Sequence, residues 1–167
     1  MSYMERFNLK GRGAIVTGAA GILGRPFCEG LAEFGADVAV VDLDTQVCRD
    51  FAAELSARHG IRAVGIGCDI TDAAAVSGMV TEAASALGDI QILHNNVGGK
   101  TPDLAAYFNS FENYSLAEWR RVMAVNIDGV FLVDQAVGRQ MVAHGRGGSI
   151  IHTASIYGAM APDQRIY

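Results

Sequence analysis

Five short apolar segments recur along the chain, and they constrain its fold more than any other feature of the sequence. Longer stretches with the apolar spacing of a helix lie between them. The predicted strands are 13–17, 38–41, 63–66, 90–93 and 149–151. The predicted helices are 23–34, 45–58, 72–87 and 116–144. Strands that alternate with helices and are apolar throughout predict an α/β fold: a doubly wound parallel sheet with helices on both faces.

The ends of the predicted helices and the composition both favour a single domain. Each predicted helix is followed by a glycine, at Gly35, Gly60, Gly88 or Gly145, and glycine best tolerates the left-handed backbone that ends a helix. No proline- or serine-rich linker and no shift in composition divides the chain. We therefore expect residues 1–167 to form one domain.

A glycine-rich turn joins the first predicted strand to the first predicted helix. Its sequence is TGAAGILGR, residues 17–25. Such a turn presents backbone N–H groups and a helix N-terminus to an anion, and glycine lets a pyrophosphate approach the backbone closely. We expect a dinucleotide to bind here, at Gly18, Gly21, Ile22, Leu23 and Gly24. A tight turn without a ligand is the alternative.

An acidic residue ends the second predicted strand. Asp42 lies 18 residues beyond Gly24 and is followed by Leu43. A carboxylate near this spacing accepts hydrogen bonds from the adenosine ribose and repels a phosphate on it, which favours NAD over NADP. Asp42 could instead be a solvated strand-end carboxylate or a cap for the helix from Thr45. A doubly wound methyltransferase would also offer these glycines and this acid, but it predicts nothing about the fourth and fifth strands.

Three later motifs follow in a characteristic order. HNNVGG (94–99) ends the fourth predicted strand, Asn126 lies within VNIDGVF (125–131), and SIIHTAS (149–155) covers the fifth. Together with the glycine turn, they make the chain resemble the short-chain dehydrogenase/reductase superfamily from Leu9 onward. This resemblance implies a Rossmann fold, an NAD cofactor, and hydride transfer between NAD(H) and a secondary alcohol or ketone.

The resemblance also implies roles for individual residues. Asn126 matches the family's active-site asparagine, and Ser155 matches its substrate-positioning serine. The remaining matches contact the cofactor: Asp69 and Ile70 at the adenine, and Asn96, Val97 and Gly98 near the nicotinamide.

Structural roles are the alternatives for several of these residues. Asp69 could support the turn before the next helix, with Thr71 as the cap of that helix. Asn95 and Asn96 could be ordinary turn residues. Asn126 could serve only the packing of its helix, and Ser155 could be a generic loop serine.

Two departures from the family pattern stand out. The usual TGxxxGxG places glycine where this chain has Ile22, which affects the placement within the family more than the cofactor. Catalysis in the family uses a Tyr-x-x-x-Lys pair, and no lysine follows Tyr167, which lies 12 residues after Ser155, one fewer than is usual. We therefore expect residues 1–167 to be the N-terminal two-thirds of an NAD-binding Rossmann domain that is incomplete at its C-terminus. The alternative is a non-catalytic NAD-binding or assembly module.

Charge and residue spacing exclude several other classes. The net charge is −5 without a polybasic cluster, which argues against nucleic acid. The apolar runs are far shorter than the roughly 20 residues of a membrane span. The three cysteines form no C-x-x-C pair, which favours a cytoplasmic protein with reduced thiols. The four histidines show no metal-binding spacing, so we expect no metal site.

Two segments outside these motifs also carry expectations. The apolar series that includes Leu116 and Trp119 predicts a buried face on the long helix 116–144. The family resemblance implies that this helix pairs across a subunit interface in a homo-oligomer. The aromatic residues between 99 and 114 could form an apolar lip over the pocket, or could pack on their own domain.

Overall fold

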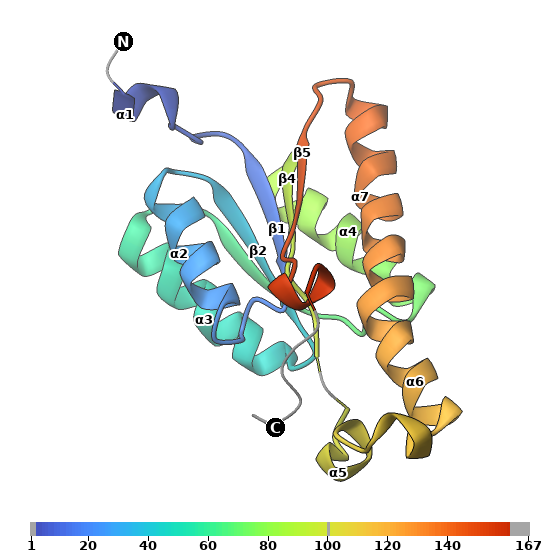
Figure 1. The fold of residues 1–167 in the computed structure, drawn as a ribbon. Helices are drawn as coiled ribbons and strands as arrows, with labels where there is room; N and C mark the ends of the chain where they lie inside the picture. Colours follow the sequence, from blue (N-terminus) through green and yellow to red (C-terminus); the bar gives the residue numbers. More distant parts are fainter. Residues whose placement is uncertain (1–2, 100, 161–167) are drawn as a thin grey trace.

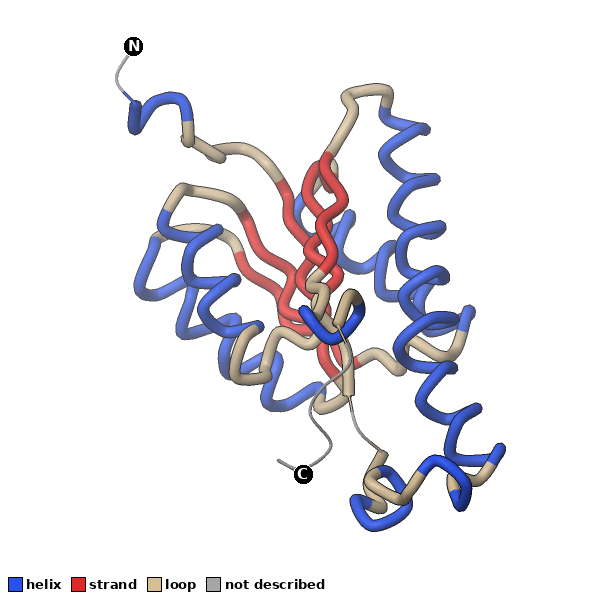
Figure 2. The backbone as a smooth tube through the Cα atoms, in the orientation of Figure 1, coloured by secondary structure: helices blue, strands red, loops and turns tan. Residues whose placement is uncertain are grey.

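The computed structural model describes residues 3–99 and 101–160, and within them the strands form one parallel sheet (Figures 1 and 2). The strands are β1 (Gly13–Thr17), β2 (Asp37–Asp42), β3 (Ala63–Gly67), β4 (Ile90–Asn95) and β5 (Ser149–His152). They are arranged in the order β3-β2-β1-β4-β5, and every neighbouring pair is parallel. The predicted doubly wound sheet is therefore confirmed, with each strand within two residues of its predicted bounds.

Helices cover both faces of this sheet (Figure 1). The longer helices are α2 (Gly24–Glu33), α3 (Thr45–His59), α4 (Ala73–Leu87), α6 (Leu116–Met123) and α7 (Val130–His144). The shorter elements are α1 (Tyr3–Arg6), α5 (Leu104–Tyr107) and 3₁₀ turns at Phe111–Asn113 and Ile156–Gly158. Helices α2 and α3 lie on one face, and α4 and α7 lie on the other.

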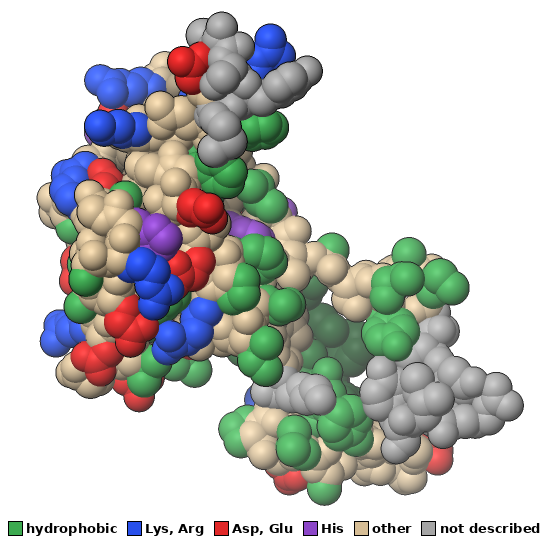
Figure 3. All heavy atoms as spheres, turned by 90° about the vertical axis from the view of Figure 1, so that its left-hand side faces the viewer, with side chains coloured by type: hydrophobic (Ala, Val, Ile, Leu, Met, Phe, Trp, Pro, Cys, Tyr) green, Lys and Arg blue, Asp and Glu red, His purple; other side chains and the backbone are tan. Residues whose placement is uncertain are grey.

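The alternation of side chains along β1 divides the core between these two faces. Ile15 joins the core beneath α4 and α7, whereas Val16 joins the core beneath α2 and α3. Successive strand residues point to opposite faces, so a strand that is covered on both sides is apolar throughout. The outer face formed by α2 and α3 carries charges of both signs, as Figure 3 shows, with Arg58 on Glu29 and Arg25 near Glu54.

The order of the strands reverses at β1. From β1 the chain builds outward through β2 to β3, and it then crosses to β4 on the other side of β1. Thr17 at the end of β1 is level with Val41 on one side and with Asn95 on the other. A ligand crevice in this class of sheet lies beyond the carboxyl ends of the strands at such a reversal, and the predicted site residues follow these ends.

The capping of the helices partly matches the prediction. Gly60 and Gly145 have φ of 68° and 66° and end α3 and α7 in the left-handed conformation. Asp72, rather than Thr71, caps α4, because its carboxylate accepts from the N–H groups of Ala74 and Ala75 at 2.7 and 3.2 Å. Asp44 caps α3, so Asp42 does not have that role.

The long predicted helix differs from the expectation in two ways. Residues Ala124–Gly129 form a π-helical segment between α6 and α7, so the helix is not regular from 116 to 144. The predicted buried face is also wrong at its start, since Leu116 and Trp119 are 60% and 51% exposed. Figure 1 shows α6 extending past the end of the sheet, so the described part of the chain does not cover the first turn of α6. No helix of the described segments is long and apolar enough to cross a membrane.

Gly65 provides a test of how closely α3 packs on β3. A Cβ atom added at Gly65 would lie 2.2 Å from the backbone of Cys48 and Arg49. Because backbone atoms cannot move aside without shifting α3, we expect Gly65→Ala to lower the free energy of unfolding by roughly 2–3 kcal/mol in urea titrations.

Gly78→Ala is the matched control, since nothing lies within 4 Å of a Cβ added at this exposed position of α4. There the gain in helix propensity should raise the stability by about 1 kcal/mol. Equal effects of the two substitutions would contradict the described packing.

Candidate active site

In the turn after β1, the backbone packs so closely that Gly18 and Gly24 cannot be replaced by larger residues without strain. Gly18 has a φ of 61°, and a Cβ added at Gly24 would lie 2.0 Å from the Gly18 carbonyl oxygen. Helix α2 begins at Gly24 without a side-chain cap. Ile22 and Leu23 are exposed, and Gly21 donates its N–H to Gly18. The turn is therefore closely packed on its inner side, and the pyrophosphate site at this turn stays a prediction.

Asp42 lies against this turn. One carboxylate oxygen accepts from the N–H of Ala20 at 3.0 Å, and the other accepts from the N–H of Leu43 at 2.8 Å. Each oxygen keeps a lone pair for a further donor. Asp42 is thus placed beside the predicted pyrophosphate site, and Leu43 next to it is exposed.

Asp69 and Ile70 follow β3 and both have structural contacts. Asp69 accepts from the N–H and the hydroxyl of Thr71 at 2.9 and 2.7 Å, and these hydrogen bonds lower the pKa of its carboxyl group. Ile70 is buried, and its side-chain carbons would lie 2.7 Å from a Cβ added at Gly129 in the π-helical segment. Asp69 therefore supports its own turn, and Ile70 packs against the segment that carries Asn126.

The buried hydroxyl of Thr17 connects β1 to the end of β4. It donates to the side-chain oxygen of Asn95 at 2.8 Å and accepts from the N–H groups of Asn96 and Val97 at 3.0 and 3.2 Å. The side chain of Asn96 donates to the Gly18 carbonyl and accepts from the Thr153 hydroxyl. Asn95, the last residue of β4, and Asn96, which follows it, therefore connect three strand ends and are not merely turn residues.

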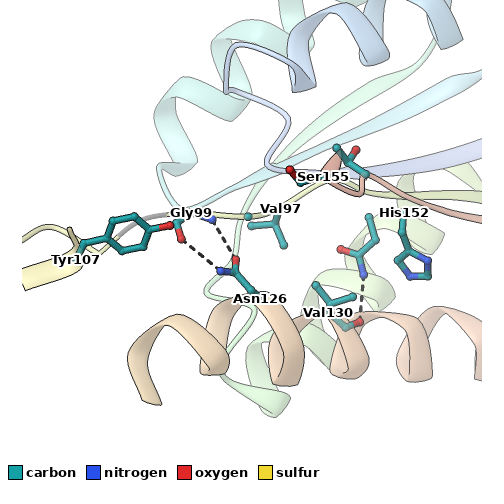
Figure 4. Close-up of a pocket in the computed structure, with 10 residues that line it drawn as sticks. Val97, Gly99, Tyr107, Asn126, Val130, His152 and Ser155 are labelled. Atoms are coloured by element: carbon teal, nitrogen blue, oxygen red, sulfur yellow. Dashed lines mark hydrogen bonds between the residues drawn. The ribbon is translucent and has the colours of Figure 1, made fainter. Parts of the chain in front are cut away.

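A pocket of about 480 Å³ opens at the carboxyl ends of β4 and β5 (Figure 4). Its lining residues are Asn95, Val97, Gly98, Gly99, Tyr107, Asn126, Val130, His152, Thr153 and Ser155. The two predicted catalytic residues thus meet in one pocket, although they come from the π-helical segment and from the loop after β5. Val97 and Gly98, which are predicted to contact the cofactor, line the same pocket.

The side chains of Asn126 and Ser155 are both held by backbone groups. The oxygen of Asn126 accepts from the Gly99 N–H at 3.1 Å, and its nitrogen donates to the Gly99 carbonyl at 3.4 Å (Figure 4). The hydroxyl of Ser155 accepts from the N–H of Tyr157 at 3.2 Å and caps a 3₁₀ turn. Its own proton is free to turn toward the pocket, so Ser155 can donate to an oxygen bound there.

The sequence analysis did not name six of the lining residues as site residues. These residues are Asn95, Gly99, Tyr107, Val130, His152 and Thr153. For Asn95 and His152, the alternation of side chains along the strands could have indicated a place in the site. The two residues are register partners at the ends of β4 and β5. Tyr107 is one of the aromatic residues between 99 and 114, and its place in the pocket lining agrees with the lip that the sequence analysis left open for them. Tyr167 lies outside the described residues.

Residues 12–167 match the family model of short chain dehydrogenases. The chain belongs to this family. Among curated relatives, D-threitol dehydrogenase of Mycolicibacterium smegmatis is 37% identical over 160 residues, which is 96% of this chain and 58% of that protein. The chain thus spans well under two thirds of this relative's length. Short-chain dehydrogenases are oxidoreductases that use a nicotinamide cofactor.

Two solved structures extend the comparison to both forms of the cofactor. An NAD⁺-bound xylitol dehydrogenase has a TM-score of 0.84 and 31% identity, with 93% of this chain and 57% of that one covered. An NADPH-dependent 3-quinuclidinone reductase from Rhodotorula rubra has a TM-score of 0.85 and 27% identity, with 96% and 59% covered. The doubly wound fold of this short-chain dehydrogenase is thereby established, whereas both cofactor forms occur among its structural neighbours.

Replacing the Thr17 hydroxyl tests the junction between β1 and β4. Thr17→Val keeps the volume but leaves two N–H groups without an acceptor and the Asn95 oxygen without a donor. Buried polar groups that lose their partners are costly, so we expect the free energy of unfolding to fall by about 3 kcal/mol in urea titrations.

Thr81→Val is the matched control, because the Thr81 hydroxyl donates only to the Ser77 carbonyl on the exposed side of α4. Its effect should stay within about 0.5 kcal/mol. A small effect at Thr17 would mean that water replaces the lost partners and that the junction does not depend on this hydroxyl.

Proposed function

We propose that the chain carries the cofactor site and part of the active site of an oxidoreductase that transfers hydride between NAD(H) and a secondary alcohol or ketone. The observation that carries the proposal is that Asn126 and Ser155 line one pocket together with Val97 and Gly98. This pocket adjoins the glycine turn through the Asn96–Gly18 hydrogen bond. The cofactor site and the predicted catalytic groups are therefore neighbours.

We assign the cofactor as NAD because of Asp42. The glycine-rich turn from Gly18 to Gly24 is the proposed pyrophosphate site, and Asp42 lies beside it with lone pairs for the ribose hydroxyls. The negative charge of Asp42 would repel a ribose phosphate. Asp69 and Ile70 complete the proposed adenine site, and Asn96, Val97 and Gly98 the nicotinamide side.

Cofactor titration tests the role of Asp42. We expect NADH to bind at least about tenfold more tightly than NADPH, and Asp42→Ala to reduce this preference because the repulsion is lost, as measured by fluorescence titration. Asp50→Ala is the control, since Asp50 is an exposed carboxylate of α3 that contacts Gln46. Equal affinities for the two cofactors in the unmodified protein would remove Asp42 from this role.

We propose that side chains of the pocket position the substrate. The bound cofactor supplies the hydride acceptor or donor. We propose that the Ser155 hydroxyl donates a hydrogen bond to the substrate oxygen, while Asn126 holds the Gly99 backbone at the edge of the pocket. A proton must also leave or reach the substrate oxygen, and the family uses a tyrosine whose pKa, ordinarily near 10, is lowered by a lysine.

The Tyr-x-x-x-Lys pair is not found in the 167 residues of the sequence. We propose that the pair, or its lysine with Tyr167, is supplied by a part of the protein that follows residue 167. The relatives are longer than this chain, which supports the proposal.

A small polyol is the substrate class that we propose. D-threitol dehydrogenase and xylitol dehydrogenase are both named for small polyols. The pocket offers several polar side chains to such a molecule, among them Tyr107, Thr153 and Ser155. A polyol presents hydroxyl groups on adjacent carbons, and each needs a partner when it leaves water.

Ser155→Ala tests the proposed active site. We expect kcat with a polyol panel to fall by about 100-fold or more, while the dissociation constant for NADH stays unchanged, because the hydroxyl faces the substrate rather than the cofactor. Ser85→Ala is the control, since the Ser85 hydroxyl donates to the Thr81 carbonyl on α4. Unchanged turnover in Ser155→Ala would exclude Ser155 from the active site.

A second candidate is a non-catalytic NAD-binding or assembly module. The intact mass of the purified protein, compared with 17.7 kDa for this chain, combined with an assay of hydride transfer, distinguishes the two. NAD binding without turnover on any alcohol or ketone would favour the module. In either case we propose that the protein is a homo-oligomer and that it is cytoplasmic. The three buried free thiols of Cys28, Cys48 and Cys68 support the cytoplasmic location.

A further inference from the structure

Asp134 connects three elements of the fold beneath the pocket. It lies on α7, and one of its carboxylate oxygens accepts from the side-chain nitrogen of Asn95 on β4 at 3.0 Å. The other oxygen is 2.7 Å from Nε2 of His152 on β5. The two contacts use different oxygens, so Asp134 holds both strand ends at once.

Asn95 extends this network to the segment that carries Asn126. The oxygen of Asn95 accepts from the Thr17 hydroxyl, and its nitrogen donates to both Asp134 and the Val130 carbonyl, the latter at 3.1 Å. Val130 is the first residue of α7 and directly follows the π-helical segment Ala124–Gly129. The amide of Asn95 therefore cannot turn over without facing the Val130 carbonyl with its own oxygen.

We propose that Asp134 and His152 are positioning residues: together they hold the first turns of α7 against β4 and β5 and thereby direct Asn126 into the pocket. This inference rests on the proposed function, because its main readout is turnover. Neither residue has to touch the reacting atoms for this role, although His152 lines the same pocket.

The protonation of His152 makes the role testable. A carboxylate accepts from an Nε2–H whether an imidazole is neutral or charged, so the contact with Asp134 does not depend on the charge of the ring. Among the described residues, the titratable groups that interact with His152 are Asp134 on α7 and His94 on β4. Burial is the main cause that lowers the pKa of His94, and the charge of His152 adds to it.

Asp134→Asn makes the contact depend on the charge of the ring. The oxygen of the new amide has to face the Asn95 nitrogen, whose orientation is fixed, so its NH₂ group faces His152. Only a neutral imidazole with an unprotonated Nε2 can accept from that NH₂ group. An imidazole that is protonated on both ring nitrogens cannot accept from that NH₂ group, so at acid pH the two groups become donors facing each other and the contact is lost.

The experiment measures kcat, KM for the alcohol and NADH affinity between about pH 5.5 and pH 8.5 for the complete protein and its variants. In Asp134→Asn we expect kcat to fall toward acid pH at least about tenfold further than in the unmodified protein, with NADH affinity unchanged. The double variant Asp134→Asn with His152→Asn should lose this additional acid sensitivity, because an amide at 152 cannot be protonated in this range. Parallel pH profiles for Asp134→Asn and the unmodified protein would overturn the inference.

A second histidine–carboxylate pair provides the matched control. Nε2 of His59 lies 2.6 Å from Glu29, and this pair connects α2 and α3 away from the pocket. Glu29→Gln should change the stability without adding acid sensitivity to kcat. A similar acid loss in Glu29→Gln would show that any broken pair of this kind has the effect, and it would overturn a specific role for Asp134 and His152.

Two further measurements cover the remaining outcomes. If Asp134→Asn does not fold, two variants of His152 replace it. We expect His152→Leu to lower kcat about tenfold with unchanged NADH affinity, and His152→Asn to have the kcat of the unmodified protein. Equal turnover in the two variants and the unmodified protein overturns the inference. If the unmodified protein transfers no hydride, the proposed function fails. Hydrogen exchange in residues 124–130 then decides. The exchange rate of Asp134→Asn is divided by that of the unmodified protein at the same pH; a ratio that rises toward acid pH supports the inference, and a ratio that does not change with pH overturns it.

Discussion

The buried hydroxyl of Thr17 is the contact on which the arrangement of the site depends. It lies at the end of β1, where the strand order reverses, and it serves three groups at the end of β4. A hydroxyl both donates and accepts, so one small side chain can face an amide oxygen and two N–H groups. The glycine turn and the Asn95–Asn96 segment are thereby brought together, and the pocket forms beside them.

Much of the fold follows from patterns that are local in the sequence. The apolar strands, the glycines after the helices and the turn from Gly18 to Gly24 all express preferences of a few neighbouring residues. The π-helical segment does not, and the residue type alone does not decide which of two neighbouring polar residues caps a helix. Asp72 takes the role expected of Thr71, because Asp69 already binds Thr71. The π-helical segment packs Gly129 against Ile70, which is distant in the sequence, and no spacing of apolar residues indicates such a contact.

The residues of the candidate site also differ in whether the sequence can identify them. Asn126 and Ser155 could be named from the sequence because their motifs occur in the family's order, and the structure brings them to one pocket. Asp134 could not be named, since its partners Asn95 and His152 are 39 and 18 residues away, and its own helix gives no sign of them. A polar residue of this kind is recognised only when the strand ends and the helix are placed together in space.

The π-helical segment also determines which changes this part of the chain tolerates. Asn126 reaches Gly99 from a segment whose backbone hydrogen bonds span five residues rather than the four of a regular helix. One residue added or removed between 116 and 125 would rotate Asn126 by about 100° about the helix axis relative to α6. Substitutions on the exposed side of α6 cause no such rotation. In related chains that share this site, we therefore expect the residue types of α6 to vary widely while its length stays constant.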